Sequence, residues 1–196
     1  MKYPANEMCV SDTTKVGGFT IIEIAVTFAI LAILLATVLV GDNKSQEPFN
    51  LVNEAYNVAV FIREAQVKAT SVISGSTDFD EAIGVHYGGG DRTMIESFND
   101  ANDDGVYAVG EKTGELTLHN KIKISNACGD GGCTSTGDPL HIVFKRPLID
   151  AHITYGGHLN DTAVLCLSAP SGATVGVIVN STGRIYVETD GSVTGC

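Results

Sequence analysis

The first hydrophobic pattern along the chain is an almost uninterrupted apolar run. Residues 19–40 contain a single charge, at Glu23. A helix of that length rises about 33 Å at roughly 1.5 Å per residue, which is enough to cross the hydrocarbon core of a bilayer. We therefore expect residues 19–40 to form a membrane-spanning helix.

A second pattern begins near residue 50 and has helical periodicity. Apolar residues recur every three or four positions as far as about residue 74. They are Leu51, Ala55, Val58, Ile62, Ala65 and Ala69. This predicts an amphipathic helix that packs on a sheet. Residues 41–44 and Pro48 interrupt the pattern between the two helices, so we expect a kink or a melted turn there.

From about residue 82 the chain changes to short β-branched runs separated by Gly, Asn and Asp, a pattern typical of strands. The expected strands cover residues 83–87, 93–98, 116–118, 122–125, 140–144, 151–155, 163–168, 175–180 and 184–189. The last two are predicted to form a hairpin across Ser181 and Thr182. The predicted fold is α+β, with a long N-terminal helix, half membrane-spanning and half amphipathic, packed on a C-terminal antiparallel β domain.

Glu23 is an unusual residue for an apolar helix. Inserting a carboxylate into a membrane span costs roughly 2.5 to 3.5 kcal/mol, so a neutralising partner and a functional role are expected. Cleavage between Gly18 and Phe19 would create an α-amino group four residues from Glu23, close to one helical turn. The amine could lie on the same helix or on a neighbour shifted along its axis, and it would supply the cation that Glu23 lacks.

Gly18, Phe19, Thr20 and Glu23 before an apolar helix resemble the class III signal of type IV pilins and type II secretion pseudopilins. The resemblance implies that a prepilin peptidase in the inner membrane cleaves after Gly18 and methylates Phe19. It also implies that Glu23 draws an incoming subunit into register through the N-terminus of its neighbour. Helical stacking of subunits into a filament would follow.

The alternative interpretation of the N-terminus is an ordinary signal peptide or signal anchor. An ordinary signal peptide has a cationic part, an apolar stretch of about 7 to 15 residues, and then a small-residue cleavage site. Here the glycine pair precedes the apolar run, and the run is longer. Residues 1–18 depart from the short basic leader of the pilin family, because two lysines are balanced by two acidic residues.

The predicted hairpin, the long helix and residues 142–147 resemble the H-type minor pseudopilins, the GspH/FimT group. The resemblance implies a leader at 1–18, a transmembrane and assembly helix at 19–40, a kink and amphipathic helix at 41–74, and a β domain at 75–196. It further implies a single-pass inner-membrane protein with its domain in the periplasm or outside. The implied partners are other pilin or pseudopilin subunits, the prepilin peptidase and an inner-membrane assembly platform.

The charge balance restricts the class of partner. The formal net charge is −11, and it is the same after removal of residues 1–18. An acidic surface repels phosphate backbones, so a nucleic-acid-binding role is disfavoured. About 155 residues follow the membrane helix, which suits one domain of ordinary size.

The cysteines favour disulfides in an exported domain. Cys9 lies in the leader, which leaves an even set of four. Three pairings are open, and we favour Cys128 with Cys133 across a glycine-rich loop and Cys166 with Cys196. The alternative, a four-thiolate zinc site, lacks a second close pair and suits a reducing compartment better.

Residues 100–111 fit the twelve-residue calcium-loop pattern D-x-[DN]-x-[DN]-G-x5-E. The expected ligands are Asp100, Asn102, Asp104, the backbone carbonyl of Tyr107 or its neighbour, and Glu111, with Gly105 making the tight turn. Strands are predicted on both sides of the loop, where an EF-hand has helices. The alternative is a solvated acidic hairpin loop whose Asp and Asn side chains only make turns.

No catalytic set is recognisable. The five histidines are scattered, and the chain has no H-E-x-x-H, G-x-S-x-G or phosphate-binding glycine motif. We therefore expect a structural subunit and not an enzyme. A minor pseudopilin and a minor pilin fit about equally, and a major pilin less well. The contrasting class is a permanently anchored exported domain that binds a ligand or hydrolyses a polymer.

Overall fold

The computed structural model describes residues 17–71, 82–88, 90, 92–119, 121–130, 132–133, 137–189 and 196, without the side chains of residues 39–45. The expected leader therefore lies outside the described residues, apart from Gly17 and Gly18. The chain divides into two units, Met1–Asp42 and Asn43–Cys196.

The first helix, α1, spans Ile21–Ser45. It begins after Thr20, whose carbonyl oxygen accepts hydrogen bonds from the amides of Glu23 and Ile24. The Thr20 hydroxyl also accepts a bond from the Glu23 amide, as a helix N-cap residue does. Among the described residues α1 is the single helix long and apolar enough to cross a membrane, over Ile21–Val38.

The observed break between the two helices is shorter than the one that the sequence predicts. Residues 41–44 are helical and belong to α1, and the break is a bend at Gln46 before α2 (Glu47–Thr70). The physical reason is Pro48, which lacks an amide hydrogen and whose ring clashes with the carbonyl four residues earlier in a continuous helix. Ending α1 at Ser45 puts Pro48 in the first turn of α2, where proline is tolerated.

In the described part of the chain ten strands follow α2. They are β1 (Ala82–Tyr87), β2 (Met94–Asp100), β3 (Lys112–Thr117), β4 (Lys123–Cys128), β5 (Leu140–Phe144), β6 (Ala151–Tyr155), β7 (His158–Asn160), β8 (Thr162–Ser168), β9 (Thr174–Asn180) and β10 (Ile185–Glu188). Strands β5 and β6 have the predicted bounds, whereas β7 was not predicted. Its signal is Gly156–Gly157, both with positive φ, which make a two-residue hairpin turn.

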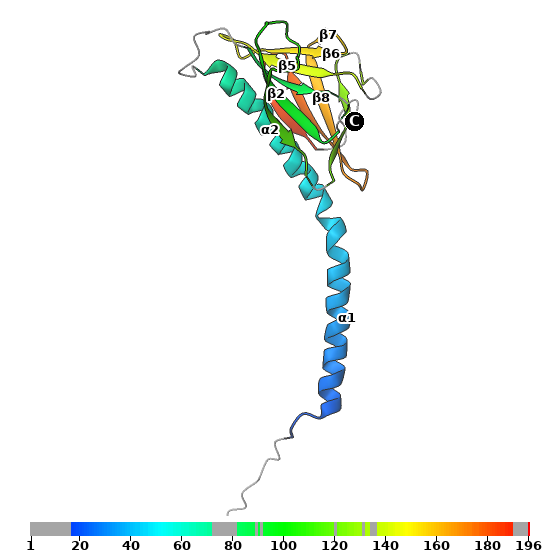
Figure 1. Cartoon of the computed structure of the whole chain (residues 1–196). Helices are drawn as coiled ribbons and strands as arrows, with labels where there is room; N and C mark the ends of the chain where they lie inside the picture. Colours follow the sequence, from blue (N-terminus) through cyan, green and yellow to red (C-terminus); the bar gives the residue numbers. More distant parts are fainter. Residues whose placement is uncertain are drawn as a thin grey trace, which may run out of the picture. The chain divides into compact units, whose positions relative to one another are not determined.

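The strands form two antiparallel sheets. The larger has the order β3-β2-β1-β5-β6-β7 and the smaller β10-β9-β8-β4. Helix α2 lies along the β domain and contacts β1 and β5 of the larger sheet and β8, β9 and β10 of the smaller one (Figure 1). The α+β prediction is therefore confirmed: an apolar N-terminal helix is followed by a second helix and an antiparallel β domain.

The main core lies where α2 meets the two sheets. The six apolar residues of α2 that the sequence assigns to one face are all at most 2% exposed. They pack with the inward residues of both sheets in a single cluster. Burying a Leu, Val or Ile side chain contributes about 1.5 to 3 kcal/mol, so this face is the main attachment of α2.

A second, smaller core lies on the other face of the larger sheet. Ala82, Phe98 and Val143 are buried there, and Tyr107 from the β2–β3 loop packs against them. Gly84 is required beneath Phe98, because a Cβ atom at that position would lie 2.5 Å from the phenyl ring. The β2–β3 loop therefore folds back over the sheet.

Candidate functional sites

The residues of the expected cleavage signal lie just before α1 and are accessible. Gly17, Gly18, Phe19 and Thr20 are exposed and not part of a helix or strand. Phe19 is 81% exposed. Glu23 is the acidic residue in the first turn of α1, four residues after Phe19. The arrangement therefore leaves both the Gly18–Phe19 bond and the Glu23 carboxylate open to another molecule.

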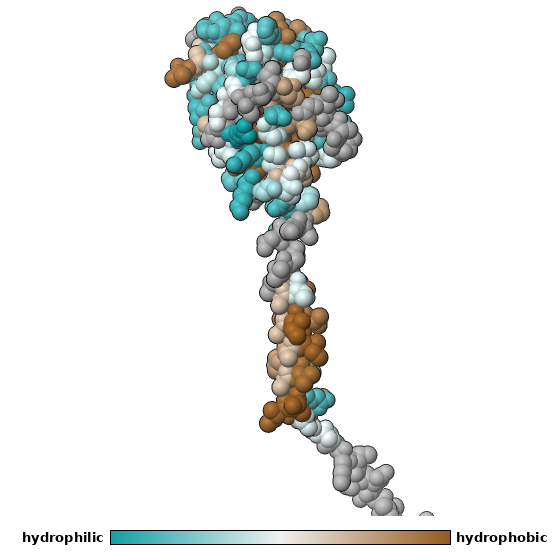
Figure 2. Space-filling view, turned by 90° about the vertical axis from the view of Figure 1, so that its right-hand side faces the viewer, coloured by the Kyte–Doolittle hydropathy of each residue, from teal (hydrophilic) through white to brown (hydrophobic). Residues whose placement is uncertain are grey.

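The described surface of α1 after Glu23, over residues 24–38, is almost wholly apolar, as the brown colour in Figure 2 shows. The large aliphatic and aromatic side chains there are 47% to 68% exposed. A groove of about 260 Å³ on this surface is lined by Phe19, Glu23, Ile24 and Thr27. A helix that is apolar on all sides is typical of a membrane span, a signal sequence or the core of a larger protein.

A stripe of exposed apolar side chains runs along α2 and was missed by the sequence analysis. Phe49, Tyr56, Val60 and Val67 are each more than half exposed. At about 100° per residue they fall within roughly 40° of one another, on the side of α2 opposite the buried face. We call these four residues the α2 stripe. Their 7-4-7 spacing in the sequence was the available signal.

The acidic loop between β2 and β3 closes on its own polar groups. The Asp100 carboxylate is 2% exposed and accepts bonds from the amides of Asp104 and Gly105. Gly105 has φ of 74°, as the predicted tight turn needs. The Asn102 amide donates to the Asp104 carboxylate over 2.9 Å. Three of the five expected ligand residues thus gather around one turn.

The remaining two expected ligand residues have other contacts. Glu111 accepts bonds from the amides of Ala101 and Ala108, which closes the base of the loop. The Tyr107 amide donates to Nδ1 of His141 over 3.0 Å. Within the described residues no group of three or more His, Cys, Asp or Glu side chains is arranged to hold a metal ion.

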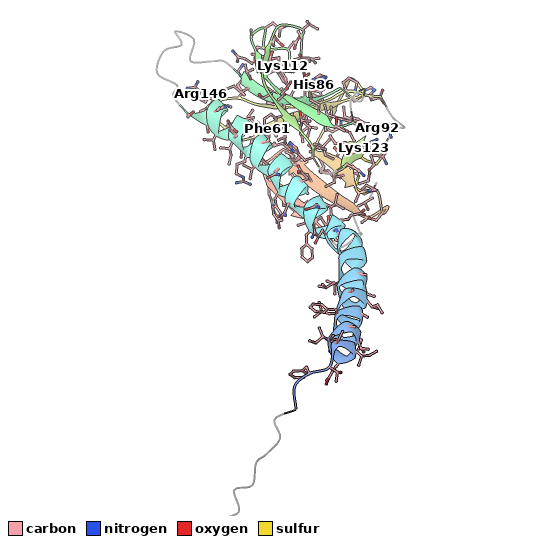
Figure 3. All side chains as sticks on the ribbon, turned by 60° about the horizontal axis from the view of Figure 1, so that its bottom comes forward. Phe61, His86, Arg92, Lys112, Lys123 and Arg146 are labelled. Atoms are coloured by element: carbon pink, nitrogen blue, oxygen red, sulfur yellow. A yellow bond between two sulfur atoms is a disulfide. The ribbon has the colours of Figure 1, made fainter. Side chains whose placement is uncertain are left out.

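The loop is also held to the sheet by contacts with side chains of β1 and of the segment after β5. Lys145 forms an ion pair with Asp103, the loop residue that the calcium pattern leaves without a ligand role. His86, labelled in Figure 3, stacks between Tyr107 at 4.4 Å and His141 at 4.7 Å between ring centroids. The two histidines face each other on β1 and β5.

Burial sets the protonation of this histidine pair. His86 is 8% and His141 3% exposed. Desolvation lowers the pKa of His86, and desolvation together with the charge of His86 lowers the pKa of His141 to about 4. Both rings are therefore neutral at pH 7, which leaves Nδ1 of His141 free to accept the Tyr107 bond. They act as packing residues here and not as accessible acid or base groups.

The cysteines are joined as Cys128 with Cys133 and Cys166 with Cys196. These are the two pairings that the sequence favours. The first closes a short loop at the end of β4, and the second ties the C-terminal residue to the buried strand β8. All four cysteines in the described part of the chain are thus joined in disulfides, so none of these four is a thiolate ligand for a zinc site.

A cavity of about 290 Å³ lies between α2 and the first strands of the larger sheet. Its walls include Phe61, labelled in Figure 3, with Ala65 and Ile83. Ser97 and Asn99 of β2 contribute polar atoms to it. The Ser97 hydroxyl bonds to Thr113, whereas Oδ1 of Asn99 is buried without a hydrogen-bond partner among the described residues.

Comparison of the chain with models of protein families, with curated proteins and with solved structures finds no match in any of the three.

Proposed function

We propose that this protein is a minor pilin or pseudopilin, a structural subunit of a type IV pilus or of a type II secretion pseudopilus. In this proposal a prepilin peptidase removes residues 1–18 and methylates Phe19. The subunit then remains in the inner membrane, with its β domain in the periplasm, until the assembly platform adds it to the filament. The protein is a building element and performs no chemistry of its own.

The observation that carries the proposal is the single carboxylate near the start of the apolar span. Glu23 is exposed on α1, one helical turn from Phe19, with the cleavable glycine immediately before. A carboxylate in hydrocarbon needs a cation, and within Ile21–Val38 the chain provides none. The new N-terminus of a neighbouring copy would supply it, and each copy could pair with the next.

The α2 stripe supports a second contact between subunits. Four large apolar side chains are aligned on the outer face of this helix, and exposed apolar patches of this kind mark interaction surfaces. Their spacing suits packing against another helix. In a filament this face would be covered by a neighbouring subunit.

We also propose that the acidic loop binds Ca²⁺. Asp100, Asn102 and Asp104 converge on the turn at Gly105, and oxygen ligands of this kind are the ones that calcium prefers. An ion there would neutralise the carboxylates and hold the loop that covers the small outer core. The ion would stabilise the loop and take no part in a reaction.

The competing function is a permanently anchored exported domain that keeps its N-terminus. The intact mass of the protein extracted from membranes separates the two. A mature chain that starts at Phe19 and carries one methyl group supports the filament subunit, whereas an intact N-terminus supports the anchor. Crosslinking followed by identification of the neighbours distinguishes a secretion pseudopilus from a pilus.

The role of Glu23 is tested by Glu23→Gln, which keeps the size of the side chain and removes its charge. We expect incorporation into filaments to fall at least about tenfold, because a lost pairing of only about 1.4 kcal/mol gives that factor. The matched control is Glu64→Gln, which removes the same charge from the exposed face of α2, outside the membrane span. Undiminished incorporation of Glu23→Gln would refute the proposal.

A further inference from the structure

A second polar side chain lies beside Glu23 on the membrane-spanning helix. Thr27 follows Glu23 by four residues, and residues at that spacing are neighbours on one face of an α-helix. Both line the groove of about 260 Å³ on the surface of α1, together with Phe19 and Ile24. The groove thus places a carboxylate and a hydroxyl side by side in a span that is almost wholly apolar.

The hydroxyl of Thr27 has unused acceptor capacity. Its hydrogen is donated to the Ile24 carbonyl over 2.8 Å, within the same helix. A threonine hydroxyl has one donor and two acceptor lone pairs, so the oxygen can still accept a bond from outside. In the hydrocarbon region no water is present to donate a hydrogen bond to this oxygen.

The occupant of the groove follows from the charge. A methylated α-amino group is a secondary ammonium with one positive charge and two N–H donors. A carboxylate oxygen of Glu23 can neutralise the charge and accept a bond from one N–H. The second N–H lies at a tetrahedral angle to the first and points away from that oxygen, so it needs a further acceptor, because an unpaired polar group in hydrocarbon is costly.

We infer that the groove is a two-residue receptor for the N-terminal amine of a second copy of this chain, in which Glu23 takes the charge and Thr27 accepts the second hydrogen bond. This inference rests on the proposed function. Thr27 acts as a positioning residue, because it fixes the orientation of the incoming amine while Glu23 provides the attraction.

The chain contains its own control in Thr37. The Thr37 hydroxyl donates to the Leu34 carbonyl over 2.8 Å, the same local bond that Thr27 makes to Ile24. It lies about 15 Å further along the helix and roughly 80° around it, away from the groove. Replacing either threonine by valine exchanges the hydroxyl for a methyl group and removes the same local hydrogen bond.

The experiment compares full-length variants, each expressed together with the parent chain in the same cells. The measured quantity is the variant-to-parent ratio in the assembled filaments divided by the ratio in the membrane. We expect Thr27→Val to be depleted about threefold to tenfold, the range for hydrogen bonds between membrane helices. Thr27→Ser, which keeps the hydroxyl, and Thr37→Val should stay within about twofold of the parent.

Intact mass must first show equal cleavage and methylation of all variants. Equal depletion of Thr27→Val and Thr37→Val, or no depletion of Thr27→Val, refutes the inference that Thr27 binds the amine. The double variant Glu23→Gln, Thr27→Val should be no more depleted than Glu23→Gln alone, and a further full-sized loss also overturns it. Normal incorporation of Glu23→Gln is a different result, since it refutes the proposed function itself.

Discussion

Ile62 and Val60 are two residues apart on α2 but face opposite ways. Ile62 is fully buried in the core between the helix and the two sheets, whereas Val60 belongs to the α2 stripe and is 64% exposed. Truncating each to alanine should therefore separate the role of the helix in folding from its proposed role in assembly.

The expected magnitudes differ clearly. Ile62→Ala removes three buried carbon atoms, worth about 0.8 kcal/mol each in transfer free energy, and leaves a cavity besides. The total loss of unfolding free energy should be about 2 to 5 kcal/mol. Val60→Ala removes atoms that are mostly in solvent and replaces valine by a better helix former, so its effect should lie within about 0.5 kcal/mol of zero.

The measurement is urea unfolding of a soluble form of the protein that begins at Gln46, with its disulfides intact. Ile62→Ala should lower the midpoint by about 0.7 M or more, given a slope of about 1 to 3 kcal/mol per molar urea. Val60→Ala should leave the midpoint unchanged. Similar shifts for both variants, or a larger one for Val60→Ala, would contradict the assignment of the two faces of α2.

Three further outcomes are expected with the same soluble form. Saturating Ca²⁺ should raise its melting temperature by about 5 to 10 °C, and Asp104→Ala should abolish the rise; a parent that ignores calcium removes that proposal. The pKa of His141 is about 4 in the folded protein against an ordinary value of 6.5, so the unfolded state takes up the proton first and stability falls as the pH drops from about 6.5 toward 4. His141→Gln should make that fall shallower, and an equally steep pH profile would argue against the buried neutral ring. Cys196→Ser, which opens a 30-residue separation, should cost about 3 to 4 kcal/mol, and Cys133→Ser, across 5 residues, about 2; unfolding free energies in the reverse order would contradict the loop-closure account.

Much of the fold could be predicted because it depends on local patterns. The apolar span needs only length and composition, and the buried face of α2 needs only the spacing from Leu51 to Ala69. Most strands followed from β-branched runs between turn residues. The observed break at Gln46 differs from the expected interruption at 41–44 and Pro48, because Gly41, Asp42 and Asn43 only lower helix propensity, whereas Pro48 removes a backbone hydrogen bond.

The candidate sites were predictable to very different degrees. Glu23 is evident from the sequence because a charge inside an apolar run is itself a local anomaly. The acidic loop was recognised by its spacing, but its attachment to the sheet was not. His86 and His141 are far apart in the sequence, and only the register of β1 with β5 brings their rings together and places Tyr107 over them.

The sequence by itself determined the elements and the lone charge, since helical and strand periodicity, proline geometry and the desolvation of a carboxylate act within a few residues of chain. Only the tertiary structure decided which apolar residues remain outside. The sequence identifies the core face of α2 by its apolar spacing, but it does not show whether the second apolar row, the α2 stripe, is also covered. In the structure the two sheets cover the core face and leave the α2 stripe exposed. Burial depends on which residues pack against a side chain. For α2 those residues lie on strands that are distant in the sequence.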